Sequence, residues 1–286
     1  MIRPMDASPA SLVNLSKYPL TALGSDAGQE LIARMRTELD RDGACCLRNF
    51  LTDDAVERLA DEATSLAPLA YPGPQEASPY FFNYQSDEAA KLPEGHPLRM
   101  RTRRRLSQVA SDLIPRDSLL RALYEWEGLA SFLAAATNVE RLYRNADRYQ
   151  ALNISVMKPG GCQQWHFDTA KCVTTLLLQT PEGGGDFEYV PAIRSEEDEN
   201  YDAVRDILQG SRTGVRAIEL AAGTLMLFRG HYSLHRVTEV TGKRDRLQSI
   251  LGFNPEPGIR GSMESNVLHY GPRVSEMTPR PLPVLS

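Results

Sequence analysis

The stretch GGCQQWHFDTAK, residues 160–171, decides how this sequence is interpreted. It reads mostly as a β-strand, yet it carries His166 and Asp168 two positions apart. Positions i and i+2 of a strand face the same side, so these two side chains would project into one space. Polar groups buried there must pair with each other or bind a metal. The pattern His-x-Asp alone is common, and a simple hydrogen-bonded pair also explains it.

A second histidine extends the pattern. His235 follows the apolar run GTLMLF and begins another strand-like run, 67 residues after Asp168. Two histidines and one carboxylate form the triad typical of non-haem Fe(II), which leaves coordination positions open. The alternative is His231, but no Glu follows it to complete a zinc H-E-x-x-H motif. We therefore favour His166, Asp168 and His235 as the metal ligands.

Arg246 is the third element of the pattern, eleven positions after His235. A guanidinium on the next strand can bind a carboxylate through two hydrogen bonds, as a 2-oxoacid co-substrate requires at its end remote from a metal. Taken alone, Arg246 is better explained as a surface arginine beside Lys243 and Arg244.

The residue pattern of the chain changes near residue 149. Residues 150–254 contain short β-branched or aromatic runs separated by turn signals, which is typical of a sandwich or barrel. Residues 1–149 are predicted to be mainly helical, with helices at 26–39 (capped by Asp26), after Thr52, and from Asp117, its expected cap, to Asn138. The run ACCLRNF, residues 44–50, is predicted to be a short strand. We expect one domain over 1–286, mainly β with N-terminal helices, a helical insertion at about 195–213, and a non-repetitive tail over the last 32 residues.

The composition and charge of the chain disfavour some classes of binding partner. The formal charge is −5 and the sequence pI about 5.6, so no basic field favours nucleic acid or an anionic membrane surface. No apolar run reaches the length of about 20 residues needed to span a bilayer, and the first residues do not resemble a signal peptide. The four cysteines show no C-x-x-C spacing. We expect a cytoplasmic protein with a small-molecule partner; the sequence does not indicate the oligomeric state.

The combined motifs resemble those of the Fe(II)/2-oxoglutarate-dependent oxygenases, whose fold is a double-stranded β-helix, or jelly roll. The segments WHFD, VTTLLLQTPEGGGDFEYVPAIR, GTLMLFRGHYSLHRVTEV and RLQSILGF are similar to bacterial oxygenases and halogenases that act on free amino acids such as lysine. The resemblance covers roughly residues 95–255.

This resemblance implies a role for each motif residue. His166, Asp168 and His235 would bind Fe(II), and Arg246 would hold the distal carboxylate of 2-oxoglutarate. Reaction with O2 would give succinate, CO2 and a reactive iron species that removes a hydrogen atom from an unactivated carbon. Halogenases of this group replace the ligand carboxylate with a small residue, so the presence of Asp168 favours hydroxylation, desaturation or cyclisation.

Clues to the substrate are weaker. Lysine-acting relatives are expected to carry acids just beyond the iron motif, whereas this chain reads Thr169, Ala170, Lys171. Lys171 would suit a neutral or anionic side-chain end, such as the nitro group of an amino acid that undergoes cyclopropane formation; it is also explained as an exposed lysine.

Further substrate contacts are predicted along two other segments. One of Arg103, Arg104 or Arg105 is a candidate to clamp an α-carboxylate, although the run RMRTRRR is also typical of a solvated basic patch. Alternation places Gln164 on the face of His166, and Asn153 lies on the preceding strand.

Two other functions are weighed against the oxygenase. A non-catalytic, cupin-like barrel that binds a metal or small ligand would not need the anchor Arg246. A zinc hydrolase is disfavoured, because no general base is evident beside the histidines.

Overall fold

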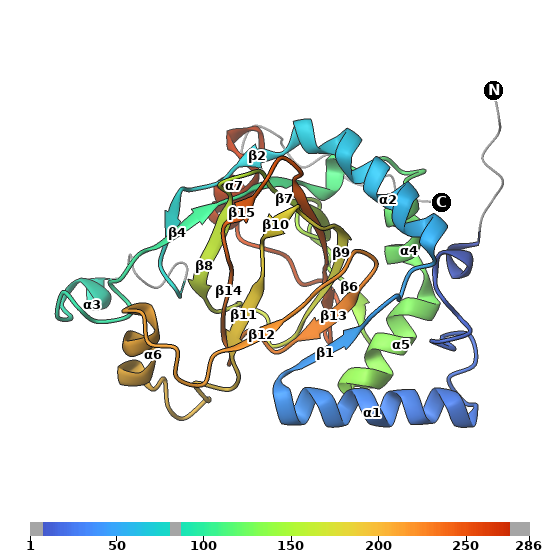
Figure 1. The fold of residues 1–286 in the computed structure, drawn as a ribbon, viewed down its shortest axis with the longest axis horizontal. Helices are drawn as coiled ribbons and strands as arrows, with labels where there is room; N and C mark the ends of the chain where they lie inside the picture. The colour runs from blue at the N-terminus through green and yellow to red at the C-terminus, as the bar shows by residue number, and fades with distance from the viewer. Residues whose placement is uncertain (1–7, 81–86, 275–286) are drawn as a thin grey trace.

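Two antiparallel sheets facing each other form the centre of the protein (Figure 1). A computed structural model describes residues 8–80 and 87–274. Within these residues one sheet has seven strands in the order β1-β13-β9-β16-β7-β5-β2, and the other has six in the order β12-β11-β14-β8-β4-β3. The predicted mainly β jelly roll is confirmed.

The strands of the seven-stranded sheet are, in that order, Ala44–Leu47, Leu225–Phe228, Val173–Gln179, Arg246–Leu251, Leu152–Met157, Ser107–Val109 and Tyr71–Pro72. Those of the six-stranded sheet are Arg216–Ile218, Phe187–Val190, Leu234–Val237, Cys162–His166, Thr102–Arg105 and Glu76–Ala77. Two short ribbons pair β10 (Gly183–Gly184) with β15 (Val240–Thr241) and β17 (Phe253–Asn254) with β6 (Tyr143–Arg144).

Helices cover the outer face of the seven-stranded sheet (Figure 1). They are α1 (Asp26–Asp42), α2 (Asp53–Leu66), α4 (Leu119–Glu125) and α5 (Glu127–Thr137). On β7, Leu152, Ile154 and Val156 point outward into this helix-covered core. Because side chains alternate along a strand, Asn153 and Ser155 face the inside, where they line a pocket. The largest apolar cluster therefore lies outside the barrel and leaves its interior available for polar groups.

The N-terminal half contributes more strand than the sequence indicated. The predicted strand at 44–50 is confirmed by β1, but β2 and β5 also join the seven-stranded sheet, and β3 and β4 the six-stranded sheet, so the sheets extend beyond the predicted core at 150–254. The β4 sequence, TRRR, has no apolar residue that would mark a strand. It is held by its neighbours, with Arg104 paired to Gln163 of β8.

The predicted N-terminal helices exist with different ends. Thr52 caps α2 as expected, but the cap of α1 is Ser25, whose hydroxyl accepts from the Gly28 amide, and not Asp26. The helix expected from residue 117 to 138 is capped by Ser118 and divided into α4 and α5 at Trp126, whose backbone is extended. Helical periodicity continues through this break, so the pattern could not reveal it.

Two short helices lie in the C-terminal half. Helix α6 (Tyr201–Leu208) falls within the segment predicted as a helical insertion. Helix α7 (Met263–Tyr270) lies in the segment predicted to be non-repetitive, and it begins after Ser262, whose hydroxyl accepts from the Ser265 amide. The remaining helical turns are η1 (Pro9–Leu12), η2 (Ala67–Leu69), α3 (Asp87–Ala90), η4 (Ser111–Leu113) and η5 (Pro272–Val274).

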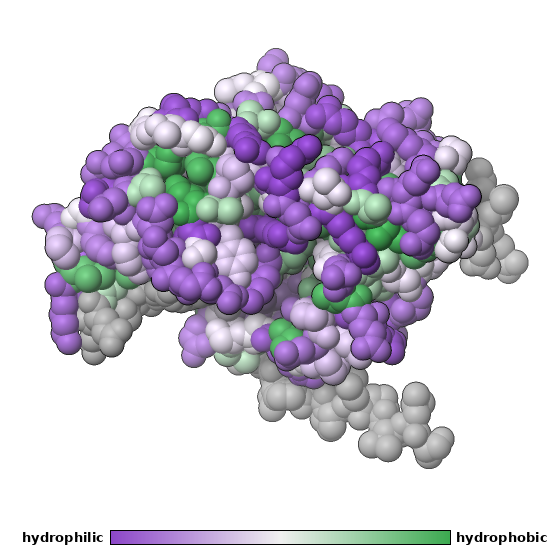
Figure 2. All heavy atoms as spheres, turned by 90° about the horizontal axis from the view of Figure 1, so that it is seen from below, coloured by the Kyte–Doolittle hydropathy of each residue, from purple (hydrophilic) through white to green (hydrophobic). Residues whose placement is uncertain are grey.

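None of the helices in the described ranges is both long and apolar enough to cross a bilayer. The face drawn in Figure 2 is mainly hydrophilic, and its apolar side chains form small separate patches.

Candidate metal centre and substrate pocket

His166, Asp168 and His235 meet at the inner face of the six-stranded sheet. His166 ends β8 and pairs directly with His235 of β14, while Asp168 lies two residues beyond the strand. One ligand atom from each of the three side chains lies within 4.8 Å of the other two. The distance from His235 Nε2 to Asp168 Oδ2 is 3.5 Å.

Backbone contacts orient the three side chains. His166 Nδ1 lies 2.8 Å from the Gln164 carbonyl oxygen, and His235 Nδ1 lies 2.9 Å from that of Ser233. Each Nδ1–H therefore donates to a carbonyl, so Nε2 carries the lone pair that a metal needs. Gly230 makes room for Asp168, because a Cβ at position 230 would collide with the Asp168 carboxylate. This donor set fits a divalent metal ion.

The charge states also suit a metal. Burial lowers the pKa of His166 to about 3, and the neighbouring His235 adds to this effect, so His166 is neutral near pH 7. Burial opposes ionisation of Asp168, but the adjacent His235 and His166 hold the pKa of its carboxyl below the ordinary value. A neutral imidazole and an ionised carboxylate are the forms that bind a metal.

His231, the alternative second histidine, lies outside this cluster. Its Nδ1 is 3.2 Å from the main-chain oxygen of Asp168, so the ring contacts the backbone of the ligand loop. The preference for His235 over His231 agrees with this geometry.

Arg246 is buried and forms no ion pair with a carboxylate of the described residues. It begins β16, is 2% exposed, and donates from Nε to the Gly185 carbonyl at 3.1 Å and from Nη1 to Gln248 Oε1 at 2.5 Å. Its Nη2 has no hydrogen-bond partner among the described residues. Burial lowers the pKa of Arg246 to about 10, so it is still charged near neutrality. A buried cation with an unused donor fits an anion such as a carboxylate.

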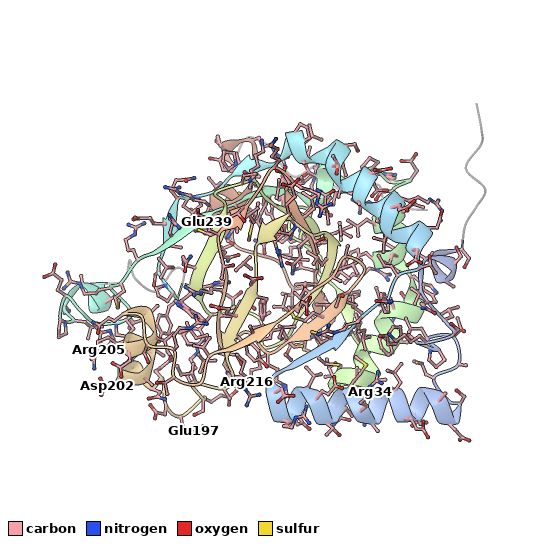
Figure 3. The ribbon with its side chains drawn as sticks, in the orientation of Figure 1. Arg34, Glu197, Asp202, Arg205, Arg216 and Glu239 are labelled. Atoms are coloured by element: carbon pink, nitrogen blue, oxygen red, sulfur yellow. The ribbon has the colours of Figure 1, made fainter. Side chains whose placement is uncertain are left out.

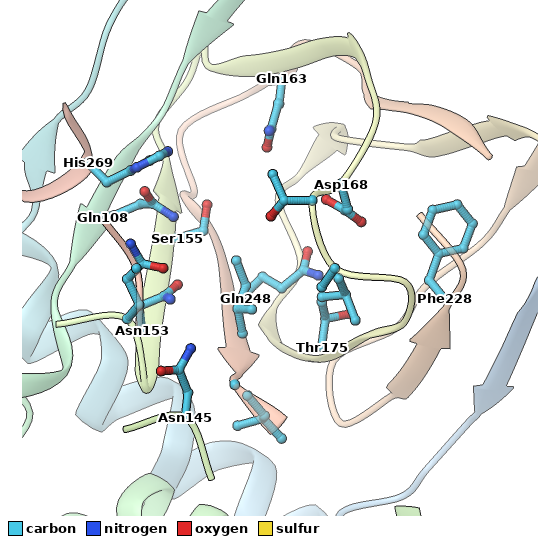
Figure 4. Close-up of a pocket in the computed structure, with 18 of the residues that line it drawn as sticks. Gln108, Asn145, Asn153, Ser155, Gln163, Asp168, Thr175, Phe228, Gln248 and His269 are labelled. Carbon is cyan, nitrogen blue, oxygen red and sulfur yellow. The ribbon is translucent and has the colours of Figure 1, made fainter. Parts of the chain in front are cut away.

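A pocket of about 480 Å³ extends from the metal triad toward α7 (Figure 4). Arg246 does not line this pocket, but Gln248, which accepts its hydrogen bond, does. Side-chain amides are common in the lining: Gln108, Asn145, Gln150, Asn153, Gln163, Gln248 and Asn254. Among the described residues of the lining, Asp168 is the only carboxylate.

An irregularity in β8 changes which glutamine faces the pocket. His166 pairs with His235 and Gln163 with Val237, so three steps along β8 correspond to two along β14. The extra residue reverses the alternation, and Gln163 shares the inner face with His166. The prediction for Gln164 is wrong for this reason: its amide oxygen accepts from Arg236 outside the pocket, at 3.1 Å.

The arginine run contributes one residue to the pocket. Arg104 pairs with Gln163 across the sheet, lines the pocket and is 3% exposed. Its Nη2 donates to Gln108 Oε1 at 3.3 Å, whereas Nε and Nη1 have no partner in the described part of the chain. Arg103 does not line the pocket: its side chain is exposed, and its Nη2 lies 2.7 Å from Oε2 of Glu239, a residue labelled in Figure 3.

Of the two other predicted substrate contacts, one lines the pocket and one does not. Asn153 lines the pocket and is buried. Lys171 does not line it: its side chain is 73% exposed and its ammonium lies 2.5 Å from the Glu196 carboxylate. Lys171 therefore lies outside the pocket, in agreement with the alternative interpretation of an exposed lysine.

Several lining residues were not identified from the sequence, among them Gln108, His269 and Tyr270. Gln108 belongs to a three-residue strand, and His269 and Tyr270 belong to α7. The cap Ser262 followed by an acid in the next turn was the available signal for α7, but helical periodicity in this segment is weak.

The half-buried His269 predicts acid sensitivity of the ligand-free fold. Burial lowers its pKa to about 4, whereas an unfolded histidine titrates near 6.5. The unfolded chain takes up this proton first, so His269 contributes stability above pH 6.5 that is lost as the pH falls toward 4, by up to about 1.4 kcal/mol per pH unit. Urea unfolding at pH 7 and pH 5 should show a smaller loss for His269→Phe than for the wild type. Equal losses would contradict the assignment.

Solved structures share the fold. They include an oxidoreductase of the 2OG-Fe(II) oxygenase family from Burkholderia pseudomallei, with 14% identity, TM-score 0.51, and 80% of this chain and 92% of that chain covered. AviO1 from Streptomyces viridochromogenes has 16% identity, TM-score 0.53, and 80% and 97% coverage. HygX from Streptomyces hygroscopicus, solved with nickel, 2-oxoglutarate and hygromycin B, has 13% identity, TM-score 0.51, and 79% and 88% coverage. No curated protein is significantly similar to the sequence.

The fold and the buried cluster of two histidines and one carboxylate together define the class of protein, the non-haem Fe(II)/2-oxoglutarate-dependent oxygenases. Residues 96–259 match the family described as Halogenase D, which is more than half of the 286 residues. The chain belongs to this family.

Proposed function

We propose that the protein uses Fe(II), 2-oxoglutarate and O2 to remove a hydrogen atom from an unactivated carbon of a free amino acid or an amino-acid-derived metabolite. The co-products are succinate and CO2. The observation that carries the proposal is a single pocket that is lined both by the metal triad and by the buried Arg104, whose two unused donors suit a carboxylate.

His166, Asp168 and His235 would hold the iron, and Arg246 would receive the distal carboxylate of 2-oxoglutarate. Bound iron would supply the oxidative decarboxylation of 2-oxoglutarate and the activation of O2. The protein's own contribution is positioning: the Gln164 and Ser233 carbonyls fix the two imidazole rings. The buried Arg246 supplies a fixed positive charge remote from water.

The proposed outcome is oxygenation or oxidative cyclisation, and not halogenation, even though the family is described as Halogenase D. The support is Asp168, whose carboxylate stands in the cluster next to Gly230 and provides the third ligand. Hydroxylation and ring closure, such as cyclopropane formation on a nitro amino acid, both begin with hydrogen abstraction.

The proposed substrate has a neutral side-chain end. A lysine side chain would bring an ammonium into a pocket whose described lining offers no carboxylate apart from Asp168. A buried cation without an acidic partner is costly. Amides and apolar side chains instead suit a neutral or nitro-bearing chain.

We also propose a cytoplasmic location. All four cysteines are free thiols, as is usual in a reducing compartment.

Succinate release tests the proposed function. With Fe(II), 2-oxoglutarate and O2, we expect a neutral amino acid such as L-norleucine, or its ω-nitro analogue, to stimulate succinate formation more than L-lysine does. Arg104→Met should lower kcat/KM by roughly 10- to 100-fold, because a charge-assisted hydrogen bond contributes about 1.5–3 kcal/mol. Lys171→Met, the matched change at an exposed cation, should leave kcat/KM within about twofold.

A different panel result would favour the alternative. If no amino acid raises succinate formation above the uncoupled rate, while the protein still binds a metal and small ligands, the non-catalytic barrel becomes the better description. If lysine is the best substrate, the argument from the missing acids fails.

A further inference from the structure

Helix α7 completes the pocket from outside the family match. It spans Met263–Tyr270, whereas the match ends at residue 259, and it supplies Ser265, His269 and Tyr270 to the lining. Figure 4 shows His269 on the same side of the pocket as Gln108, Ser155 and Asn153, with Asp168 on the opposite side. His269 of α7 therefore lies across the cavity from the metal ligand Asp168.

Hydrogen bonds fix α7 to the loop before β7. Asn266 Nδ2 donates to Asp147 Oδ2 at 2.9 Å, and Gln150 Nε2 donates to Asn266 Oδ1 at 2.8 Å. The Gly261 amide also donates to Asp147 Oδ2, at 3.1 Å. The wall formed by α7 is thus held in place without a ligand, which lowers the entropic cost of binding one.

Asn153 offers a buried acceptor on this side of the pocket. Its side chain is 5% exposed and hydrogen-bonds to the Tyr270 hydroxyl. Its Oδ1 has no hydrogen-bond partner among the residues described. A buried acceptor that is left unpaired costs free energy, so this atom points to a donor supplied by a ligand.

His269 offers a second acceptor. Its Nδ1 lies 2.8 Å from the Ser265 carbonyl oxygen, so Nδ1 carries the proton and Nε2 the lone pair. Burial and the nearby charge of Arg104 both lower the pKa of the ring, which keeps it neutral near pH 7. A neutral ring with this tautomer accepts a hydrogen bond at Nε2.

The donor and acceptor atoms of this wall match the head group of an α-amino acid. Resting on the proposed function, we propose that Asn153 Oδ1 and His269 Nε2 bind the substrate's ammonium group while Arg104 binds its carboxylate. Tyr270 connects the proposed ammonium site to the proposed carboxylate site, since it contacts Asn153 and lies close to the charge of Arg104. The ammonium is recognised by neutral acceptors alone, and its charge is balanced by the carboxylate of the same molecule.

This arrangement makes the pocket selective for a zwitterion. A carboxylic acid without the amino group would leave Asn153 Oδ1 unpaired, and a lone ammonium would meet the positive charge of Arg104. N-acylated amino acids would present an amide with one donor in place of three. The protein should therefore reject peptides and acylated substrates at this end.

Calorimetry on the full-length protein with Fe(II) and 2-oxoglutarate, without O2, measures binding separately from turnover. The probes are L-norleucine and hexanoate, which differ by the amino group. We expect the wild type to bind L-norleucine roughly 10- to 100-fold more tightly, as for a hydrogen bond to a charged group. Asn153→Ala should reduce this ratio about 10-fold or more, and His269→Phe should also reduce it. Gln209→Ala, an amide change at the exposed end of α6 and outside the pocket, should leave the ratio unchanged.

The outcomes separate this proposal from the proposed function. If hexanoate affinity is retained in Asn153→Ala and the ratio falls, the site is folded and the ammonium contact is supported. If both the Asn153→Ala and His269→Phe variants keep the wild-type ratio, the ammonium contact is refuted, while an amino-acid substrate still stands. If the wild type binds neither probe, the amino-acid substrate itself is wrong, and this proposal falls with it.

Discussion

Replacing Asp168 with alanine should abolish iron-dependent turnover. The carboxylate is the only anionic member of the cluster, since a metal binds imidazole in its neutral form. Loss of groups that merely orient metal ligands costs 10- to 100-fold in metal affinity, so loss of a direct ligand should cost at least about 100-fold. Metal content after gel filtration and the rate of succinate formation measure the effect.

His231→Ala is the matched control for Asp168→Ala. His231 contacts the Asp168 main chain through Nδ1 and stands outside the cluster, so its loss should leave stoichiometric iron binding. If Asp168→Ala kept both wild-type iron content and wild-type turnover, the assignment of Asp168 as a ligand would be wrong. If the His231 variant lost iron as completely as Asp168→Ala, the choice between the two histidines would have to be reopened.

The metal cluster could be predicted because its signals lie in the local sequence. His166 and Asp168 are adjacent in the pattern, and the apolar run before His235 marks the strand that carries it. Antiparallel pairing then brings residues 166 and 235 together directly, as the register shows. Residue type, spacing and strand periodicity sufficed for these positions.

The substrate side of the pocket could be predicted only in part. Strand alternation predicts Gln164 on the inner face of the sheet, but one additional residue in β8 places Gln163 there instead. Arg104, which pairs with Gln163, lies on the same face. A bulge depends on pairing between distant strands, which no local pattern reveals. Lys171 had the residue type for a substrate contact, but its direction is set by an ion pair with Glu196.

The fold, like the pocket, could be predicted only in part from local sequence signals. Turn residues mark the ends of the barrel strands in the sequence. The sequence pattern of α7 is weak, and the helix is held by contacts with Asp147 and Gln150. Those contacts bring His269 and Tyr270 into the pocket. The residues that we expect to determine specificity therefore come from an element that is stabilised mainly by tertiary contacts.

Replacing Arg246 with methionine should weaken 2-oxoglutarate binding without destabilising the ligand-free protein. Truncating one partner of a buried charge pair costs about 2–5 kcal/mol, which corresponds to roughly 30- to several-thousand-fold in affinity. Among the described residues Arg246 forms no ion pair: it donates to the carbonyl of Gly185 and the amide of Gln248, and Asp186 acts on it only as a nearby charge. Burying a cation without a directly paired carboxylate is costly, so an apolar side chain of similar length should maintain or raise the unfolding temperature.

Thermal unfolding with and without 2-oxoglutarate distinguishes a binding role from a structural one. In the wild type, a ligand bound only by the folded state raises the unfolding temperature as its concentration exceeds Kd. In Arg246→Met that rise should disappear while the starting temperature holds. Arg246→Lys keeps the charge but loses the planar fork, and should restore only part of the rise. A starting temperature that fell sharply, with the ligand effect intact, would instead make Arg246 a structural cation.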